Sequence, residues 1–134
     1  MISKSYAGHS VENGGDLIAK DFYDIGQTII CSLQKSYYSR TNPKLLTQLQ
    51  NTMKTGKISS QDFLFLNGKS VEAINRPQTL EITINRTNWL RLTDIRQKFL
   101  LVLHEYLWLS GLDDTNFFMS SKMINSSMNP DCSI

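Results

Sequence analysis

The sequence FLLVLHEYLWL, residues 99–109, decides the fold, because all of its residues except His104 and Glu105 are apolar or aromatic. A helix that is apolar on every side is buried at the centre of a domain. Asp94 is placed to cap the start of this helix and Gly111 to end it, so we expect a long buried helix between these two residues. Its two polar side chains need a cleft, a metal ion or fixed hydrogen-bond partners, because burying an unpaired charge is costly.

Two further helices are predicted ahead of the central one. Apolar residues recur at intervals of three and four over about 17–38, and Asp16 can cap the start of that helix. Pro43 suits the first turn of a second helix, roughly 43–54.

The period of the apolar pattern then changes from helical to extended. Asn67-Gly68 between the runs 63–66 and 69–74 is typical of a β-hairpin, and Leu80–Asn85 alternates between apolar and polar residues. We therefore expect an α+β fold, in which N-terminal helices and an antiparallel sheet of about three strands surround the long buried central helix.

Composition places the chain among globular domains and excludes several partners. The chain has 134 residues, of which 40% are hydrophobic and 19% charged, and its net charge is +2. We expect a flexible N-terminal arm over 1–15 and a single globular domain over 16–134. The small charge predicts no nucleic-acid partner, and no apolar run approaches the roughly 20 residues of a membrane span. Oligomeric state leaves no signature in the sequence.

Cys31 and Cys132 are the two cysteines of the chain. One interpretation is a pair of unrelated thiols, with Cys31 buried in a helix and Cys132 on a loose C-terminal tail. The other is a disulfide that holds the tail to the body of the domain in an oxidising compartment.

The end of the central helix resembles the active-site motif of the metzincin metalloproteases, HExxHxxGxxH/D. Residues 104–114 read HEYLWLSGLDD. The positions in register are His104, Glu105, Gly111 and Asp114. The resemblance implies zinc bound by His104 and Asp114, with Glu105 as the general base for a metal-bound water.

The sequence departs from this motif at the second ligand, where Trp108 replaces histidine. An indole cannot coordinate zinc, and catalytic zinc sites normally use three protein ligands. His9 is the other histidine of the chain and would have to complete the set from the N-terminal arm. We therefore expect no cofactor, with zinc as the alternative.

A second resemblance covers more of the chain. Residues 84–89 (INRTNW), 102–107 (VLHEYL) and 111–114 (GLDD) are similar to a group of small exported proteins of predatory bacteria. This resemblance brings no activity with it, but it implies a location in the cell envelope or outside the cell. A cytoplasmic location is the alternative. The resemblance also favours the disulfide.

The preferred functional hypothesis is a pseudo-metalloprotease: a zincin-like domain that has lost its catalytic zinc and binds a peptide or protein segment. In active zincins the strand ahead of the active-site helix pairs with an extended peptide, which assigns that role here to Leu80–Asn85. The side chains expected to contact the partner are Trp108, Tyr106, Ile82, Ile84 and Arg86.

Two alternatives stay open. An active metal-dependent hydrolase would use His104, Asp114 and a third ligand, with Glu105 as base. An unrelated structural or interaction module would instead keep His104 and Glu105 as a buried polar network. In that case the expected ion-pair partners of Glu105 or the aspartates are Arg86, Arg91 and Arg96.

Overall fold

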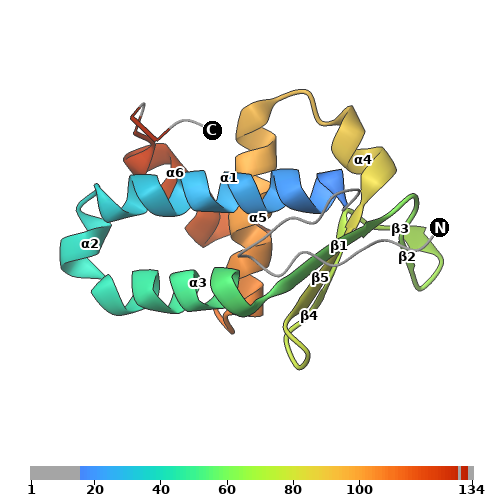
Figure 1. Ribbon diagram of the computed structural model, residues 1–134, viewed down its shortest axis with the longest axis horizontal. Helices are drawn as coiled ribbons and strands as arrows, with labels where there is room; N and C mark the ends of the chain where they lie inside the picture. The colour runs from blue at the N-terminus through green and yellow to red at the C-terminus, as the bar shows by residue number, and fades with distance from the viewer. Residues whose placement is uncertain (1–15, 130, 133–134) are drawn as a thin grey trace.

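Helix α5 (Ile95–Leu109) lies at the centre of the molecule, with the other elements arranged around it (Figure 1). The computed structural model describes residues 16–129 and 131–132. Asp94 caps α5 by accepting a hydrogen bond from the backbone N–H of Arg96 at 2.9 Å. Gly111 follows the helix with a φ of +81°, a conformation that glycine adopts without strain. The buried central helix is present with the predicted ends.

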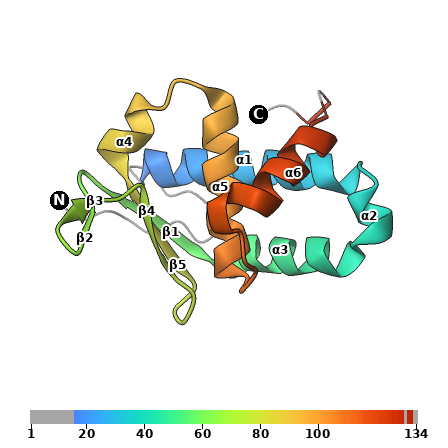
Figure 2. The same ribbon diagram turned by 180° about the vertical axis from the view of Figure 1, so that it is seen from behind.

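Helices from both ends of the chain pack on α5, with α1 and α3 visible on one side in Figure 1 and α6 on the other in Figure 2. Their bounds are α1 (Leu17–Gln34), α3 (Pro43–Thr55) and α6 (Phe118–Ser127). Asp16 caps α1, as predicted, by accepting a hydrogen bond from the N–H of Ala19. The first helix is shorter than expected, and α2 (Tyr38–Thr41) forms a separate turn. The hydroxyl of Ser36 donates to the carbonyl of Leu33, a local bond that competes with a further turn of α1.

The main sheet has three strands in the order β1-β5-β4. They are β1 (Lys57–Gln61), β4 (Ala73–Arg76) and β5 (Glu81–Asn85). The central strand, β5, runs parallel to β1 and antiparallel to β4. The α+β class is confirmed, but the sheet is mixed, so the expected antiparallel sheet is wrong.

Strand β1 is one of the elements that the sequence analysis missed. Its sequence, KISSQ, is mostly polar and lacks the run of branched or aromatic residues typical of strands. A distant residue fixes it instead: the carboxylate of Asp16 accepts a hydrogen bond from the backbone N–H of Ser60 at 2.6 Å and another from its hydroxyl at 2.7 Å. Asp16 therefore caps α1 and holds β1 at the same time.

The predicted hairpin forms a small sheet of its own, with β2 (Phe65–Leu66) antiparallel to β3 (Lys69–Ser70). Its turn residues, Asn67 and Gly68, both have positive φ angles, as a type I′ turn requires. The expectation that this hairpin belongs to the same sheet as Leu80–Asn85 is wrong. A short helix that was not predicted, α4 (Arg86–Arg91), follows β5 directly.

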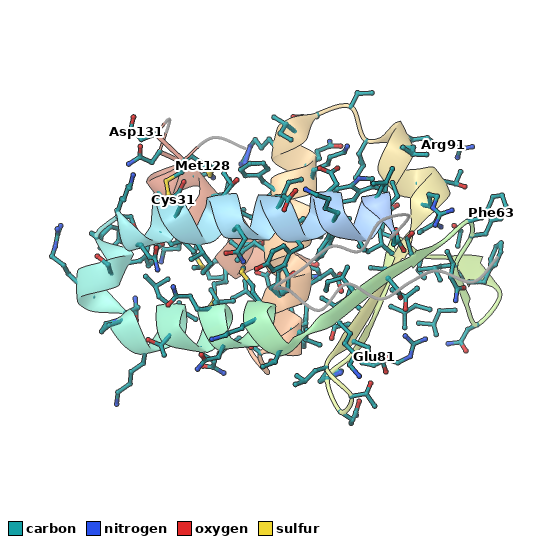
Figure 3. The ribbon with its side chains drawn as sticks, viewed as in Figure 1. Cys31, Phe63, Glu81, Arg91, Met128 and Asp131 are labelled. Carbon is teal, nitrogen blue, oxygen red and sulfur yellow. A yellow bond between two sulfur atoms is a disulfide. The ribbon has the colours of Figure 1, made fainter. Side chains whose placement is uncertain are left out.

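A disulfide joins Cys31, in α1, to Cys132 near the C-terminus (Figure 3). The Cα atoms of the two residues lie 5.7 Å apart. Beside it, the backbone N–H of Asn129 donates to the hydroxyl of Ser32 at 3.2 Å. The segment after α6 is thus held against α1. The predicted arm 1–15, which includes His9, lies outside the described residues.

Candidate functional site

His104 and Asp114 are bonded directly to each other. Nδ1 of His104 lies 2.7 Å from Oδ2 of Asp114. The other oxygen, Oδ1, accepts a hydrogen bond from the backbone N–H of Ser120 at 2.8 Å, near the start of α6. Asp114 is completely buried, so both of its oxygens have protein partners and neither faces solvent. The aspartate orients the imidazole and ties α6 to the centre of α5.

An aromatic ring covers the imidazole of His104. The rings of His104 and Phe117 stack with their centroids 4.1 Å apart. Phe117 and its neighbour Asn116 both have positive φ angles, 58° and 55°, which an aromatic residue rarely adopts. Such strain persists only where the surroundings impose it, and here it brings the Phe117 ring over His104.

Glu105 points toward the sheet. Its Oε1 accepts a hydrogen bond from the side-chain amide of Asn75, in β4, at 3.1 Å. The same amide donates to the backbone carbonyl of Glu105 at 2.8 Å. Oε2 of Glu105 lies 4.0 Å from Nε2 of His104. Two hydrogen bonds therefore attach strand β4 to the middle of α5.

Burial raises the pKa of the Glu105 carboxyl above its ordinary value. The hydrogen bond from Asn75 and the proximity of His104 act in the opposite direction, and the nearby negative charge of Asp114 raises the pKa further. Loss of water is the dominant cause, because only 8% of Glu105 is exposed. The site therefore favours a protonated Glu105 over a wider pH range than an exposed glutamate has.

The residues of the metzincin-like motif do not fit a catalytic zinc ion of that family's kind. Trp108 occupies the position of the second ligand, and both oxygens of Asp114 are already bonded to His104 and Ser120. Nε2 of His104 remains as a single nitrogen donor beside Glu105. In the described part of the chain no group of three or more His, Cys, Asp or Glu side chains is placed to hold a metal ion.

Strand β4 presents a free edge next to these residues. The backbone N–H of Asn85 donates to the carbonyl of Glu72 at 2.9 Å. With the register of the two strands, this bond shows which residues of β4 direct their backbone groups at β5 and which direct them away. In an antiparallel pair, alternate residues direct both of their backbone groups at the partner strand. Ala73 and Asn75 therefore direct their N–H and C=O groups away from β5. No other strand of the described chain pairs with this edge.

A cavity of about 240 Å³ opens between the start of β4, α5 and the Phe117 ring. Its lining residues are Glu72, Leu92, Gln97, Leu100, Leu101 and Phe117. Because Glu72 immediately precedes β4 and Phe117 stacks on His104, the cavity lies at one end of the free edge. We call the free edge of β4 together with this cavity the β4 groove.

Strand addition at Leu80–Asn85, as the sequence analysis expects, is wrong because β5 is paired on both sides. Three of the side chains assigned to partner contact are also excluded: Ile82, Ile84 and Tyr106 are fully buried in the core. Side chains alternate between the two faces of a strand, so Ile82 and Ile84 lie on the same buried face of β5. Trp108 is 37% exposed, with its ring 6.3 Å from that of His104.

The arginines do not pair with Glu105, contrary to expectation. Arg86 forms an ion pair with Asp62 at 3.0 Å and donates to the hydroxyl of Ser60. It therefore links the end of β5 to β1. Arg96 donates to the side-chain oxygen of Asn125 on α6. Glu105 is bonded to Asn75 instead.

Asn75 and Phe117 are the site residues that the sequence analysis missed. Asn75 has no strand signal in the sequence, because the four residues of β4 are too few and too polar to show alternation. Phe117 depends on an unusual backbone conformation that has no sequence signature. Comparison of the chain with models of known protein families, with curated proteins and with solved structures finds no match.

Proposed function

We propose that this domain is a binding module that holds an extended peptide or protein segment along the β4 groove and uses no catalytic zinc. The observation that carries the proposal is the free edge of β4, where Ala73 and Asn75 direct backbone groups outward beside Glu105 and no other strand of the described chain pairs with them. A segment that adds to such an edge gains main-chain hydrogen bonds whatever its sequence, and pockets for alternate side chains supply the selectivity.

The cavity at the end of this edge accounts for selectivity. A strand added beside β4 would direct every second side chain toward the helical side of the sheet. There the cavity of about 240 Å³, lined mostly by leucines and Phe117, accepts one large apolar side chain. We infer that the bound segment carries a leucine, methionine or aromatic residue at this position.

The pair His104–Glu105 has a positioning role in this proposal. The two bonds between Asn75 and Glu105 hold β4 at a fixed distance from α5, so the groove keeps its shape before any partner arrives. The Asp114 carboxylate similarly fixes His104, on which Phe117 stacks. A groove formed in advance loses less conformational entropy on binding. This role explains two polar residues in an otherwise apolar helix without a metal ion.

The test uses random peptides displayed on phage, selected against the disulfide-bonded protein. We expect selected peptides to contain one conserved large apolar residue and to shift the NMR signals of the Ala73 and Asn75 amides. Ala73→Pro removes one outward N–H, at the first position of an edge strand where proline is tolerated, and should weaken binding at least tenfold. Ala73→Ser retains that N–H and is the matched control. Selected peptides that bind Ala73→Pro as tightly as the control would contradict the proposal.

Metal content distinguishes the alternative, an active hydrolase, from the proposed binding module. The protein purified without chelator is analysed for zinc per chain, and its melting temperature is compared with and without EDTA. We expect no stoichiometric zinc and no effect of EDTA. Zinc at one equivalent per chain, with a lower melting temperature in EDTA, would instead support the hydrolase and require a third ligand.

A further inference from the structure

Three large apolar side chains are exposed on the β2–β3 hairpin and the residues just before it. Phe63 is 63% exposed, Phe65 62% and Leu66 53%, and we call these three residues the hairpin tip. The hairpin lies at the end of the molecule farthest from α2 in both views (Figures 1 and 2). Figure 3 shows Phe63 at the outer margin of that end. Exposed apolar side chains that gather in one place mark an interaction site.

The apolar residues lie on both faces of the hairpin. Phe65 and Leu66 are consecutive in β2, so their side chains point to opposite faces. A hairpin that rests on a flat protein surface buries only one of its faces. Two apolar faces at an exposed end are instead suited to surroundings that enclose the tip on every side, such as the interface of a lipid bilayer.

The hairpin is held in place by its own turn and by contacts at its base. Its type I′ turn matches the twist of the two strands, and Leu64, which is 4% exposed, anchors its base in the protein. The helix α4 braces the same base, because the N–H and the hydroxyl of Thr87 both donate to the carbonyl of Asp62. Insertion of the tip therefore needs little ordering of the chain.

One cation lies in the hairpin itself, and a second is exposed at the same end of the molecule as Phe63 (Figure 3). Lys69 lies directly across from Leu66 in the hairpin, and Arg91 is exposed at the end of α4. Neither forms an ion pair with an acidic residue of the described chain. Glu72, at the base of the hairpin, accepts a hydrogen bond from Asn88. Cations at the same end as an apolar tip, without an ion pair in the described chain, complement the headgroups of anionic lipids.

We propose that the hairpin tip inserts into the interface of an anionic lipid bilayer and attaches the domain reversibly to a membrane surface. Three side chains are too few for permanent anchoring, because even a single myristoyl chain binds only reversibly. The proposal does not depend on the β4 groove, since none of its residues lines that groove. It concerns contact with a membrane surface, and no helix in the described part of the chain is long and apolar enough to cross a bilayer.

The test is flotation of the disulfide-bonded full chain with vesicles of phosphatidylcholine, with and without phosphatidylglycerol. We expect binding to the mixed vesicles and weaker binding to phosphatidylcholine alone. Replacing each tip residue by serine should lower the partition coefficient by about tenfold. The triple variant F63S/F65S/L66S should therefore remain in the unbound fraction. Phe118→Ser, at an aromatic residue that is 72% exposed on α6, is the matched control and should float like the unmodified chain.

Two further measurements distinguish insertion of the tip from adsorption to the outside of the lipid headgroups. Lys69→Gln and Arg91→Gln should each weaken binding to the anionic vesicles about fivefold and leave binding to phosphatidylcholine unchanged. In the variant Phe65→Trp, brominated lipid should quench the fluorescence of the added tryptophan more strongly than that of the native tryptophans. Failure of the unmodified chain to float with the mixed vesicles would overturn the proposal. Flotation of the triple variant to the same extent as the unmodified chain would also overturn it. A tip that binds a protein partner but no vesicles would overturn it as well.

Discussion

Nδ1 of His104 and Oδ2 of Asp114 lie 2.7 Å apart, so the first and third positions of the metzincin-like motif are bonded to each other. A carboxylate that is completely buried and bonded through both oxygens acts as part of the framework. The pair connects the middle of α5 to the start of α6 through the backbone N–H of Ser120. The residues that resemble a catalytic motif therefore stabilise the fold around the β4 groove.

Asp114→Asn should destabilise the protein by about 1–3 kcal/mol, because an amide cannot accept both of the hydrogen bonds that the carboxylate accepts. Urea unfolding at neutral pH measures the change. Asp113→Asn is the control: Asp113 is exposed, and the amide oxygen can still accept the bond from the N–H of Thr115. Unfolding of that variant should match the unmodified protein. Equal stability of the two variants would show that Asp114 is not part of the framework.

The raised pKa of Glu105 makes stability depend on pH. The folded chain keeps this proton to a higher pH than the unfolded chain does, so stability falls as the pH rises from the ordinary pKa of glutamate through the raised pKa. The contribution is complete below the ordinary pKa and is lost above the raised one. Glu105→Gln should remove this fall and be more stable than the unmodified protein at neutral pH.

The measurement is the free energy of urea unfolding of both proteins over a series of pH values from about 4 to 8. The difference between the two curves isolates Glu105 from the other titrating groups. Glu81→Gln, on β5, is the control for replacing a glutamate by glutamine elsewhere in the chain. A Glu105→Gln variant that is less stable at every pH would indicate that the charged form of Glu105 is stabilised by a partner.

The sequence predicts the three longest helices, α1, α3 and α5, well because their signals are local. The apolar run 99–109, the cap at Asp94 and Gly111 after the helix are all contained in one segment. Strand β1 could not be predicted, because its position depends on a bond between Ser60 and Asp16, which are far apart in the sequence. Strand order also depends on contacts between residues far apart in the sequence. The alternation of β5 indicates a strand, but it does not indicate that both of its edges are paired.

The candidate site is predictable only in part for a related reason. The adjacent polar residues in an apolar helix indicate that His104 and Glu105 need partners, and Asp114 is found in the motif itself. Asn75, which reaches Glu105 from β4, becomes a neighbour only when the sheet packs on α5. Ile82 and Ile84 show the converse: their alternation correctly marks a strand, but it cannot distinguish a buried face from a binding face.

Reduction of the disulfide should lower stability by about 4–5 kcal/mol, because Cys31 and Cys132 are 101 residues apart and their link restricts a large part of the unfolded chain. The measurement is urea unfolding with and without a phosphine reductant. The double variant C31S/C132S should unfold at the same urea concentration as the reduced protein, and the reductant should not affect it. If the double variant and the oxidised protein unfold together, the disulfide contributes nothing to the stability of the folded state.

The crossing of α1 and α5 depends on the absence of a side chain at Gly26. A Cβ atom at this position would lie 2.9 Å from Cε2 of Tyr106, and Tyr106 is fully buried, so its ring has no free space to move into. Alanine favours a helix over glycine by about 1 kcal/mol, but overpacking a core costs typically 1–3 kcal/mol. We expect the second effect to dominate, so that Gly26→Ala lowers the melting temperature.

A neighbouring residue of α1 and a double variant test the role of the Tyr106 ring. Gln27→Ala, at an exposed position of the same helix, gains helix propensity without a contact and should melt at or slightly above the temperature of the unmodified protein. Tyr106→Leu removes the ring, so adding Gly26→Ala to it should cost less than the same substitution costs alone. If Gly26→Ala lowers the melting temperature equally in the two backgrounds, contact with the Tyr106 ring is not the reason that α1 requires glycine at position 26.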